Sequence, residues 1–216
     1  MLRAIDKEKH MKHSQAFWDK AAARYARSPI RDEQSYQKKL AITQGYLRPD
    51  WSVLEFGCGT GSTALVHAAY VRQILATDLS AQMVAIARDK ARQAGISNVR
   101  FEQGTLDSPA LTAASFDAVL GLNVLHLVED TEAAVVRVAH LLKPGGIFVS
   151  STALIAELAR YWRLLIPAMQ ALGLAPAVSR FDRQALLAML TRAGFDIDYE
   201  WQPAKAQLFL VARKAR

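Results

Sequence analysis

The segment Val53–Gly61, with the sequence VLEFGCGTG, constrains the fold more than any other part of this 216-residue chain. An apolar run with strand character leads directly into glycines at every second position, and a helix-like segment over 62–69 follows. Glycines are needed where the backbone turns sharply and approaches a ligand more closely than a Cβ atom allows. Because open α/β sheets bind ligands at the carboxyl ends of their strands, the segment predicts a ligand cradle at that edge.

A second feature, Asp78, ends the next strand-like run at the spacing from the glycines that suits a carboxylate gripping a ribose. A P-loop is excluded because Gly61 is followed by Ser62 rather than by lysine, and evenly spaced glycines do not fit a dinucleotide motif. Glu55 precedes the glycines, where a carboxylate would repel a pyrophosphate but accept a hydrogen bond from an ammonium group. The pattern predicts a ligand with an amino acid and a nucleoside but no phosphates.

From Trp51 onward, strand-like runs alternate with helix-like segments, which is typical of βαβ units and a parallel sheet. Ser80 and Thr131 are predicted N-caps of helices over 81–94 and 131–142, and a further helix is expected over 182–193. The last two runs are close enough for a hairpin, so we expect an α/β fold: a doubly wound, seven-stranded, mostly parallel sheet with an antiparallel C-terminal edge and helices on both faces. The expected strands are 52–55, 72–77, 99–103, 116–121, 146–151, 195–201 and 207–212.

The net charge and the cysteine content indicate which partners and which cellular compartment to expect. The net charge of +7 suits nucleic acid or an anionic membrane surface, but no base-reading module is visible, so no nucleic-acid partner is expected. The single cysteine, Cys58, cannot form an internal disulfide, and neither a signal peptide nor a membrane span is apparent. A soluble, cytoplasmic protein without a metal site is the expectation.

On these motifs the chain resembles the class I S-adenosylmethionine-dependent methyltransferases, in particular the branch that includes the ubiquinone and menaquinone C-methyltransferases. The resemblance runs over 53–151 and also rests on Ala76–Ser80 followed by Met83, on Phe116–Val119 and on Leu142–Gly146. It implies a Rossmann-like fold, S-adenosyl-L-methionine as the cofactor, and methyl transfer to a small molecule. The family commonly has an aspartate directly after the glycine at 104, whereas here it comes later, at 107. The cofactor-binding residues implied are Glu55, Gly57, Cys58, Gly59, Gly61, Asp78, Leu79, Met83, Gly104, Thr105, Leu106 and Asn123.

The resemblance also divides the chain. Residues 1–216 are expected to form a single domain. Its expected parts are an N-terminal helical cap (1–50), a cofactor-binding core (51–152), a helical lid insertion (153–180), and a C-terminal helix with a β-hairpin (181–216).

His126 is the candidate general base, since it follows the fourth strand at the ligand-binding edge and an ordinary imidazole titrates near neutrality. The alternative is a structural histidine at the start of a helix. We interpret the acidic residues at the start of the next helix as caps rather than as metal ligands; they are Glu129, Asp130 and Glu132. Aromatic and apolar residues of the cap and the lid are candidates for the acceptor pocket, with core packing as the alternative: Trp18, Tyr25, Tyr36, Tyr161, Trp162 and Met169.

The apolar composition of 154–174 favours an apolar acceptor, with an oxygen, nitrogen, sulfur or carbon nucleophile. Two alternatives stay open. One is a phospholipid or quinone methyltransferase at a membrane surface, with peripheral membrane contact through the lid and the basic N-terminus. The other is a non-catalytic S-adenosylmethionine-binding partner protein. A monomer or a homodimer is expected.

Overall fold

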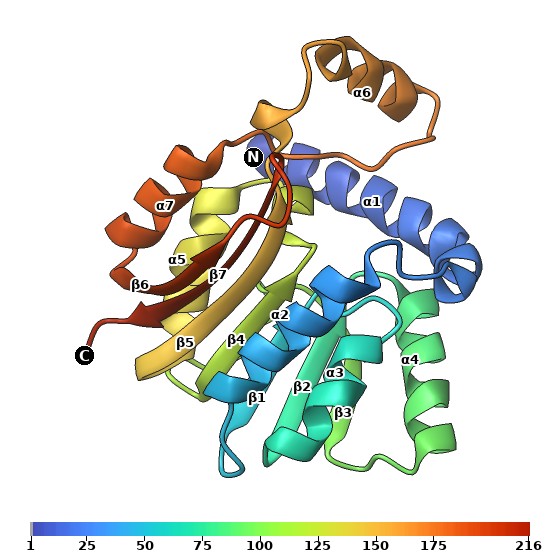
Figure 1. Ribbon diagram of the computed structural model, residues 1–216. Coiled ribbons are helices and arrows are strands. Elements are labelled where there is room, and N and C mark those ends of the chain that lie inside the picture. The colour runs from blue at the N-terminus through green and yellow to red at the C-terminus, as the bar shows by residue number, and fades with distance from the viewer. Residues whose placement is uncertain (1) are drawn as a thin grey trace.

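The structure is a computed structural model that describes residues 2–216, with side chains described for residues 11–162, 165–170 and 172–216. Within this part of the chain, seven strands form one sheet in the order β3-β2-β1-β4-β5-β7-β6 (Figure 1). β1 to β5 run parallel, whereas β7 is antiparallel to both β5 and β6. The expected sheet, including its antiparallel C-terminal edge, is confirmed. The strands are β1 (Ser52–Phe56), β2 (Gln73–Asp78), β3 (Val99–Gln103), β4 (Phe116–Leu122), β5 (Leu142–Ala153), β6 (Phe195–Trp201) and β7 (Gln207–Lys214).

Helices cover both faces of the sheet (Figure 1). The core on one face includes residues of α3 and α4, and the core on the other includes residues of α5 and α7. α1 lies across the carboxyl edge of the parallel strands, and α6 stands above that edge (Figure 1). The helices are α1 (Leu2–Arg27), α2 (Glu33–Tyr46), α3 (Ser62–His67), α4 (Ala81–Ala94), α5 (Thr131–Leu141), α6 (Trp162–Ala171) and α7 (Arg183–Arg192), and the short 3-10 helices are η1 (Ala68–Tyr70), η2 (Leu125–Leu127) and η3 (Ile155–Glu157).

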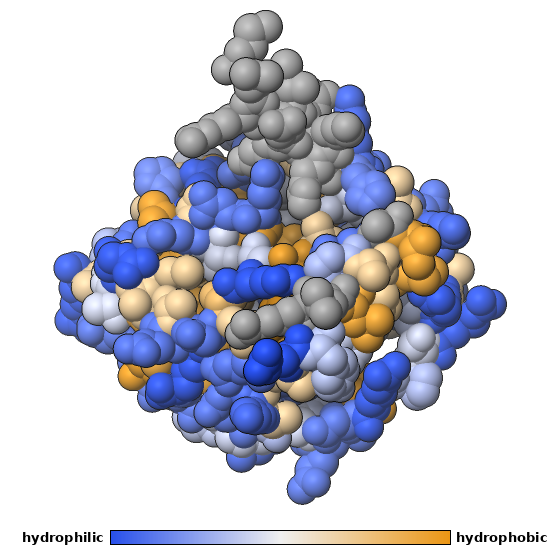
Figure 2. Space-filling view, turned by 90° about the horizontal axis from the view of Figure 1, so that it is seen from above, coloured by the Kyte–Doolittle hydropathy of each residue, from blue (hydrophilic) through white to orange (hydrophobic). Residues whose placement is uncertain are grey.

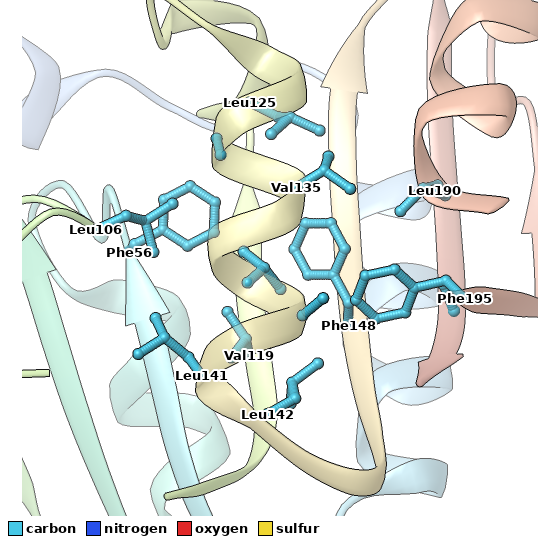
Figure 3. Close-up of a cluster of buried hydrophobic side chains, with 14 of the residues drawn as sticks. Phe56, Leu106, Val119, Leu125, Val135, Leu141, Leu142, Phe148, Leu190 and Phe195 are labelled. Atoms are coloured by element: carbon cyan, nitrogen blue, oxygen red, sulfur yellow. The ribbon is translucent and has the colours of Figure 1, made fainter. Parts of the chain in front are cut away.

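Alternation along the strands sorts the apolar side chains into these two cores. On β1, Leu54 and Phe56 join the core under α5 and α7, whereas Val53 joins the core under α3 and α4. Beside α5, the ring centroid of Phe148 lies 6.4 Å from that of Phe56 and 6.1 Å from that of Phe195 (Figure 3). This packing holds the carboxyl end of β1 against the middle of β5.

Of the two predicted N-caps, the structure confirms that of α4 and corrects that of α5. Ser80 caps α4 as expected, and its hydroxyl accepts from the N–H of Met83 over 3.1 Å. The cap of α5 is Asp130 rather than Thr131, because the Asp130 carboxylate accepts from the N–H of Ala133 over 2.9 Å. A carboxylate at that position also interacts favourably with the positive end of the helix.

The segment expected as a helical lid is less helical than its composition indicates. β5 continues to Ala153, because residues 147–153 pair antiparallel with β7. Only η3 and the ten-residue α6 are helical in the stretch up to 174, and Pro167 lies inside α6 instead of ending it. Pairing with a strand that lies far along the sequence therefore overrides the local helical pattern.

Candidate functional site

A cavity of about 1110 Å³ lies at the carboxyl edge of the parallel strands. Its walls come from α1, from the loops after β1, β2, β3 and β4, from the start of α5, and from residues 178–181. Segments far apart in the sequence therefore meet around one space. The predicted site residues that line it are Trp18, Tyr25, Gly57, Gly59, Asp78, Leu79, Met83, Gly104, Thr105, Leu106 and Asn123.

The glycine turn after β1 forms the floor of one end of this cavity. Gly57 has φ of 63°, and a Cβ atom there would lie 2.2 Å from Cγ2 of Val124. Gly59 has φ of 54°, and a Cβ atom there would come within 3.7 Å of the Tyr25 ring. Both positions require glycine for their backbone conformation, and Gly57 also requires it for space. The turn is a cradle that a ligand can approach at backbone distance.

Asp78 joins this cradle to the start of α4. One carboxylate oxygen accepts from the N–H of Gly59 over 2.8 Å and the other accepts from the N–H of Ser80 over 2.9 Å. Burial raises the pKa of Asp78, and the two N–H donors oppose that effect. Each carboxylate oxygen carries further lone pairs, so the group can still accept from a pair of ligand hydroxyls.

Glu55 lies beneath the cradle, in β1, and its side chain does not line the cavity. The residue is 2% exposed, and its Oε2 atom has no hydrogen-bond partner among the described side chains and backbone. Burial, and secondarily the nearby Asp78, raise the pKa of Glu55 to about 8. A buried oxygen that lacks a hydrogen-bond donor costs free energy unless a ligand supplies the donor. An ammonium group of a ligand is such a donor.

Helix α1 brings aromatic side chains over the cradle. Trp18 and Tyr25 line the cavity and make an edge-to-face contact, with ring centroids 6.3 Å apart. The Asp19 carboxylate, between them in sequence, accepts from the hydroxyl of Ser80 over 2.6 Å and from the N–H of Gln82 over 3.2 Å. The start of α4 thus anchors α1, which closes one side of the cavity.

His126 is not among the residues that line the cavity. Its Nδ1 lies 3.2 Å from Oγ1 of Thr152 and 3.4 Å from the N–H of Ala153, which donates to it. Burial lowers the pKa of His126 to about 4, so the ring is neutral near pH 7. These contacts hold η2 against the end of β5, which is what a structural histidine would do. A role of His126 as general base stays a prediction.

Other predicted residues lie around the cavity rather than on its wall. Cys58 and Gly61 belong to the same turn as the cradle, and burial raises the pKa of the Cys58 thiol. Trp162 lines a separate cavity of about 180 Å³ beside η3. Tyr36, Tyr161 and Met169 line neither cavity.

Sequence reasoning missed the wall formed by residues 178–181. This irregular segment carries no periodic pattern, and hydrogen bonds to distant backbone place it. The N–H of Ser179 donates to the carbonyl oxygen of His126 over 2.8 Å, and its hydroxyl donates to that of Val128. Other lining residues that were not predicted as site residues are Met11, Ser14, Phe56, Asp107, Leu122, Val124, Leu127, Val128, Glu129, Asp130, Thr131, Glu132, Ala133, Ala134, Arg180, Phe181 and Met189.

The comparison with known proteins is consistent with this geometry. Residues 53–146 match the profile of a methyltransferase domain. This segment therefore carries the sequence pattern of a methyltransferase domain. The family predicted from the motifs is confirmed, and with it S-adenosylmethionine as the cofactor of this family. The glycine cradle and Asp78 lie inside the matched range.

Two relatives illustrate the methyltransferase match. An "uncharacterized methyltransferase YcgJ" of Bacillus subtilis is 36% identical over 110 residues, which are 51% of this chain and 44% of that protein. A ubiquinone biosynthesis O-methyltransferase of Xanthomonas axonopodis pv. citri is 37% identical over 100 residues, which are 46% of this chain and 42% of that protein. The aligned region spans less than half the length of each of these relatives.

Two solved structures share the fold. YcgJ of Bacillus subtilis has a TM-score of 0.68 at 21% identity, covering 83% of this chain and 99% of that one. An S-adenosylmethionine-dependent methyltransferase of Mesorhizobium loti has a TM-score of 0.70 at 22% identity, covering 85% and 99% of the two chains. The likeness therefore extends well beyond the matched domain, to most of the sheet and its helices.

Proposed function

We propose that this protein transfers a methyl group from S-adenosylmethionine to a small, apolar acceptor. The cofactor supplies a methyl group that is already electrophilic, so the protein must position the acceptor and exclude competing groups. The observation that carries the proposal is the cradle itself. Asp78 offers paired acceptors for ribose hydroxyls, and the orphaned Glu55 oxygen offers one for an ammonium group.

The acceptor is assigned to the part of the cavity that lies away from β2. There the wall carries apolar side chains beside a few charged ones such as Glu129 and Arg180, a lining that suits a mainly apolar molecule with few polar groups. The cavity is large enough to hold such a molecule beside a nucleoside-sized ligand. The apolar residues concerned are Leu127, Val128, Val178, Phe181 and Met189.

Calorimetric titration with S-adenosylmethionine and S-adenosylhomocysteine, beside NADH and ATP, tests the cofactor. Micromolar binding of the first two alone is the expected result. Transfer of a labelled methyl group to phenols, thiols, quinols or phospholipids then tests catalysis. Binding without transfer to any acceptor would favour the non-catalytic alternative, and the absence of binding would contradict the proposal.

The raised pKa of Glu55 predicts that S-adenosylhomocysteine binds more tightly as the pH rises toward about 8. Without ligand the carboxyl is mostly protonated at pH 7, whereas the ligand's ammonium group favours the carboxylate. Binding should therefore release up to about one proton at pH 7, and the affinity should level off above the raised pKa. Titration calorimetry in buffers of different ionisation enthalpy measures this release.

Glu55→Gln should abolish the proton release and flatten the pH dependence. Glu102→Gln is the matched control, because Glu102 pairs with Arg100 at the surface and does not line the cavity. Equal proton release in wild type and Glu55→Gln would show that another group responds to the ligand.

A second candidate, methylation of a lipid-like acceptor at a membrane surface, rests on the exposure of apolar side chains around α6. Tyr161, Leu172 and Leu174 are 63%, 74% and 64% exposed. Seen from the side on which α6 lies, the surface shows apolar patches among hydrophilic residues (Figure 2). Basic side chains of α1, among them Lys20 and Arg24, could add attraction to anionic headgroups. Among the described residues, no helix has the length and apolar character needed to cross a membrane.

Sedimentation with phosphatidylcholine vesicles, with and without phosphatidylserine, tests this candidate. We expect binding to the anionic vesicles at low salt and its loss in Leu172→Asp. Val66→Asp, which also charges an exposed apolar position but on α3, should still bind. Failure of the wild type to sediment with either vesicle would remove the membrane version.

A further inference from the structure

Asn123 has an unusual backbone conformation at the edge of the cavity. It lines the cavity directly after β4 and has φ of 58°, which is uncommon for a residue other than glycine. Its N–H donates to the carbonyl oxygen of Ser151 over 2.6 Å, which holds the turn against the end of β5. The location of the Asn123 side chain is thus set by the fold and not by a flexible loop.

A chain of hydrogen bonds reaches this side chain from α2. Nζ of Lys39 donates to Oγ of Ser151 over 3.0 Å, and Oγ of Ser151 donates to Oδ1 of Asn123 over 3.3 Å. Ser151 is 3% exposed, and Lys39 is partly buried. Three side chains from separate elements are therefore connected at one place under the cavity.

The chemistry of the three groups fixes the direction of these bonds. An ammonium group can only donate, so the Ser151 hydroxyl accepts from Lys39 and has a single proton left to donate. That proton goes to Oδ1 of Asn123. With its oxygen engaged, the amide keeps both Nδ2 hydrogens for other partners, and Asn123 becomes a hydrogen-bond donor on the cavity wall.

The burial of Lys39 is not explained by an ion pair. Within residues 11–216, no carboxylate lies within salt-bridge distance of its ammonium group. Burial lowers the pKa of Lys39, and the nearby Asp32 offsets this effect in part. Withdrawing a charged group from water costs free energy, so a simpler apolar residue would serve better if Lys39 only attached α2 to the sheet.

We propose that Lys39 and Ser151 are positioning residues that hold the Asn123 amide as a donor to a carboxylate oxygen of the cofactor's methionine arm. The inference rests on the proposed function, since it takes S-adenosylmethionine as the ligand. It assigns to α2, which does not line the cavity, a part in recognising that ligand.

The test compares two ligands by titration calorimetry. S-adenosylhomocysteine carries the carboxylate, whereas 5′-methylthioadenosine has the same nucleoside and thioether but no amino acid. Lys39→Met and Ser151→Ala should each weaken S-adenosylhomocysteine binding by about tenfold, near the lower end of what one lost hydrogen bond to a charged group causes, and leave 5′-methylthioadenosine binding within about twofold. Lys39→Arg, which keeps a donor, should recover most of the loss.

Lys38→Met is the matched control. Lys38 is the neighbouring lysine of α2, but its ammonium group lies over the Trp201 ring, 4.0 Å from the ring centroid, and should not affect either ligand. Equal weakening of both ligands in Lys39→Met and Ser151→Ala, or of neither, would overturn the inference. If Lys39→Met does not fold, Ser151→Ala decides.

A second readout needs no ligand. The side-chain amide signals of Asn123 in a ¹H–¹⁵N spectrum should shift in Lys39→Met and Ser151→Ala and stay in place in Lys38→Met. Absence of that shift would also overturn the inference. Failure of the wild type to bind S-adenosylhomocysteine would instead contradict the proposed function. The spectrum would still decide whether the chain of hydrogen bonds from Lys39 to Asn123 exists.

Discussion

Asp78→Ala should weaken the binding of S-adenosylhomocysteine by at least about a hundredfold while the sheet stays folded. The variant loses the acceptors for the ribose hydroxyls, and hydrogen bonds to a charged group contribute about 1.5–3 kcal/mol each. It also loses the bonds from the N–H groups of Gly59 and Ser80, which hold the cradle and the start of α4 together. The first loss acts only on the bound state and the second acts on the cradle with or without ligand, whereas the two apolar cores do not contain Asp78 and should stay intact.

Titration calorimetry measures this loss, and far-ultraviolet circular dichroism checks the fold. Asp78→Asn keeps one oxygen acceptor and should lie between wild type and alanine. Asp89→Ala removes an exposed carboxylate of α4 that pairs with Arg92, so it should bind as the wild type does. An affinity of Asp78→Ala within about threefold of wild type, which is under 1 kcal/mol, would mean that the ribose site lies elsewhere.

Gly61→Ala should destabilise the protein by about 3 kcal/mol or more, through strain and overpacking together. Gly61 has φ of 76°, and a Cβ atom there would lie 2.7 Å from Cβ of Ala87 and 2.7 Å from the Phe101 ring. Real Cβ atoms do not come so close, so either α3 must shift away from α4 or the strand β3 must yield. Urea unfolding followed by circular dichroism measures the change.

Gly95→Ala separates the two contributions. Gly95 has a similar φ of 65° at the end of α4, but a Cβ atom there would meet nothing within 4 Å. It should therefore cost only the backbone strain, about 1–2 kcal/mol. Equal losses in the two variants would show that the packing around Gly61 adjusts freely and does not require glycine.

Local features of the sequence predicted the glycine cradle at one end of the cavity and much of the sheet. The glycine turn and Asp78 needed only their neighbours along the chain, and the strands 99–103 and 195–201 have the predicted bounds. The opposite end of the cavity could not be predicted in this way. Residues 178–181 are placed by hydrogen bonds from Ser179 to backbone some fifty residues earlier, and β5 is extended by β7.

The same reasoning explains why some aromatic candidates line the cavity and others do not. Trp18 and Tyr25 do so because α1 is anchored through Asp19 to the start of α4, an interaction between side chains that no periodicity indicates. Tyr161 directly precedes α6, is 63% exposed, and lines neither described cavity. Composition identified both segments as aromatic, but tertiary contacts decide which one reaches the site.

The position of β7 has a consequence for how the molecule is made. This strand follows β6 along the chain, yet it lies inside the sheet, between β5 and β6. During synthesis one edge of β5 has unpaired backbone N–H and C=O groups until residues 207–214 have left the ribosome. Such an edge can pair with another chain and cause aggregation. The half of the molecule that contains the cradle can pair its strands earlier, whereas the end of β5 that carries Ser151 is paired on both sides only after residues 207–214 have been made. The edge of the cavity at Asn123, which Ser151 contacts, is therefore completed after the cradle.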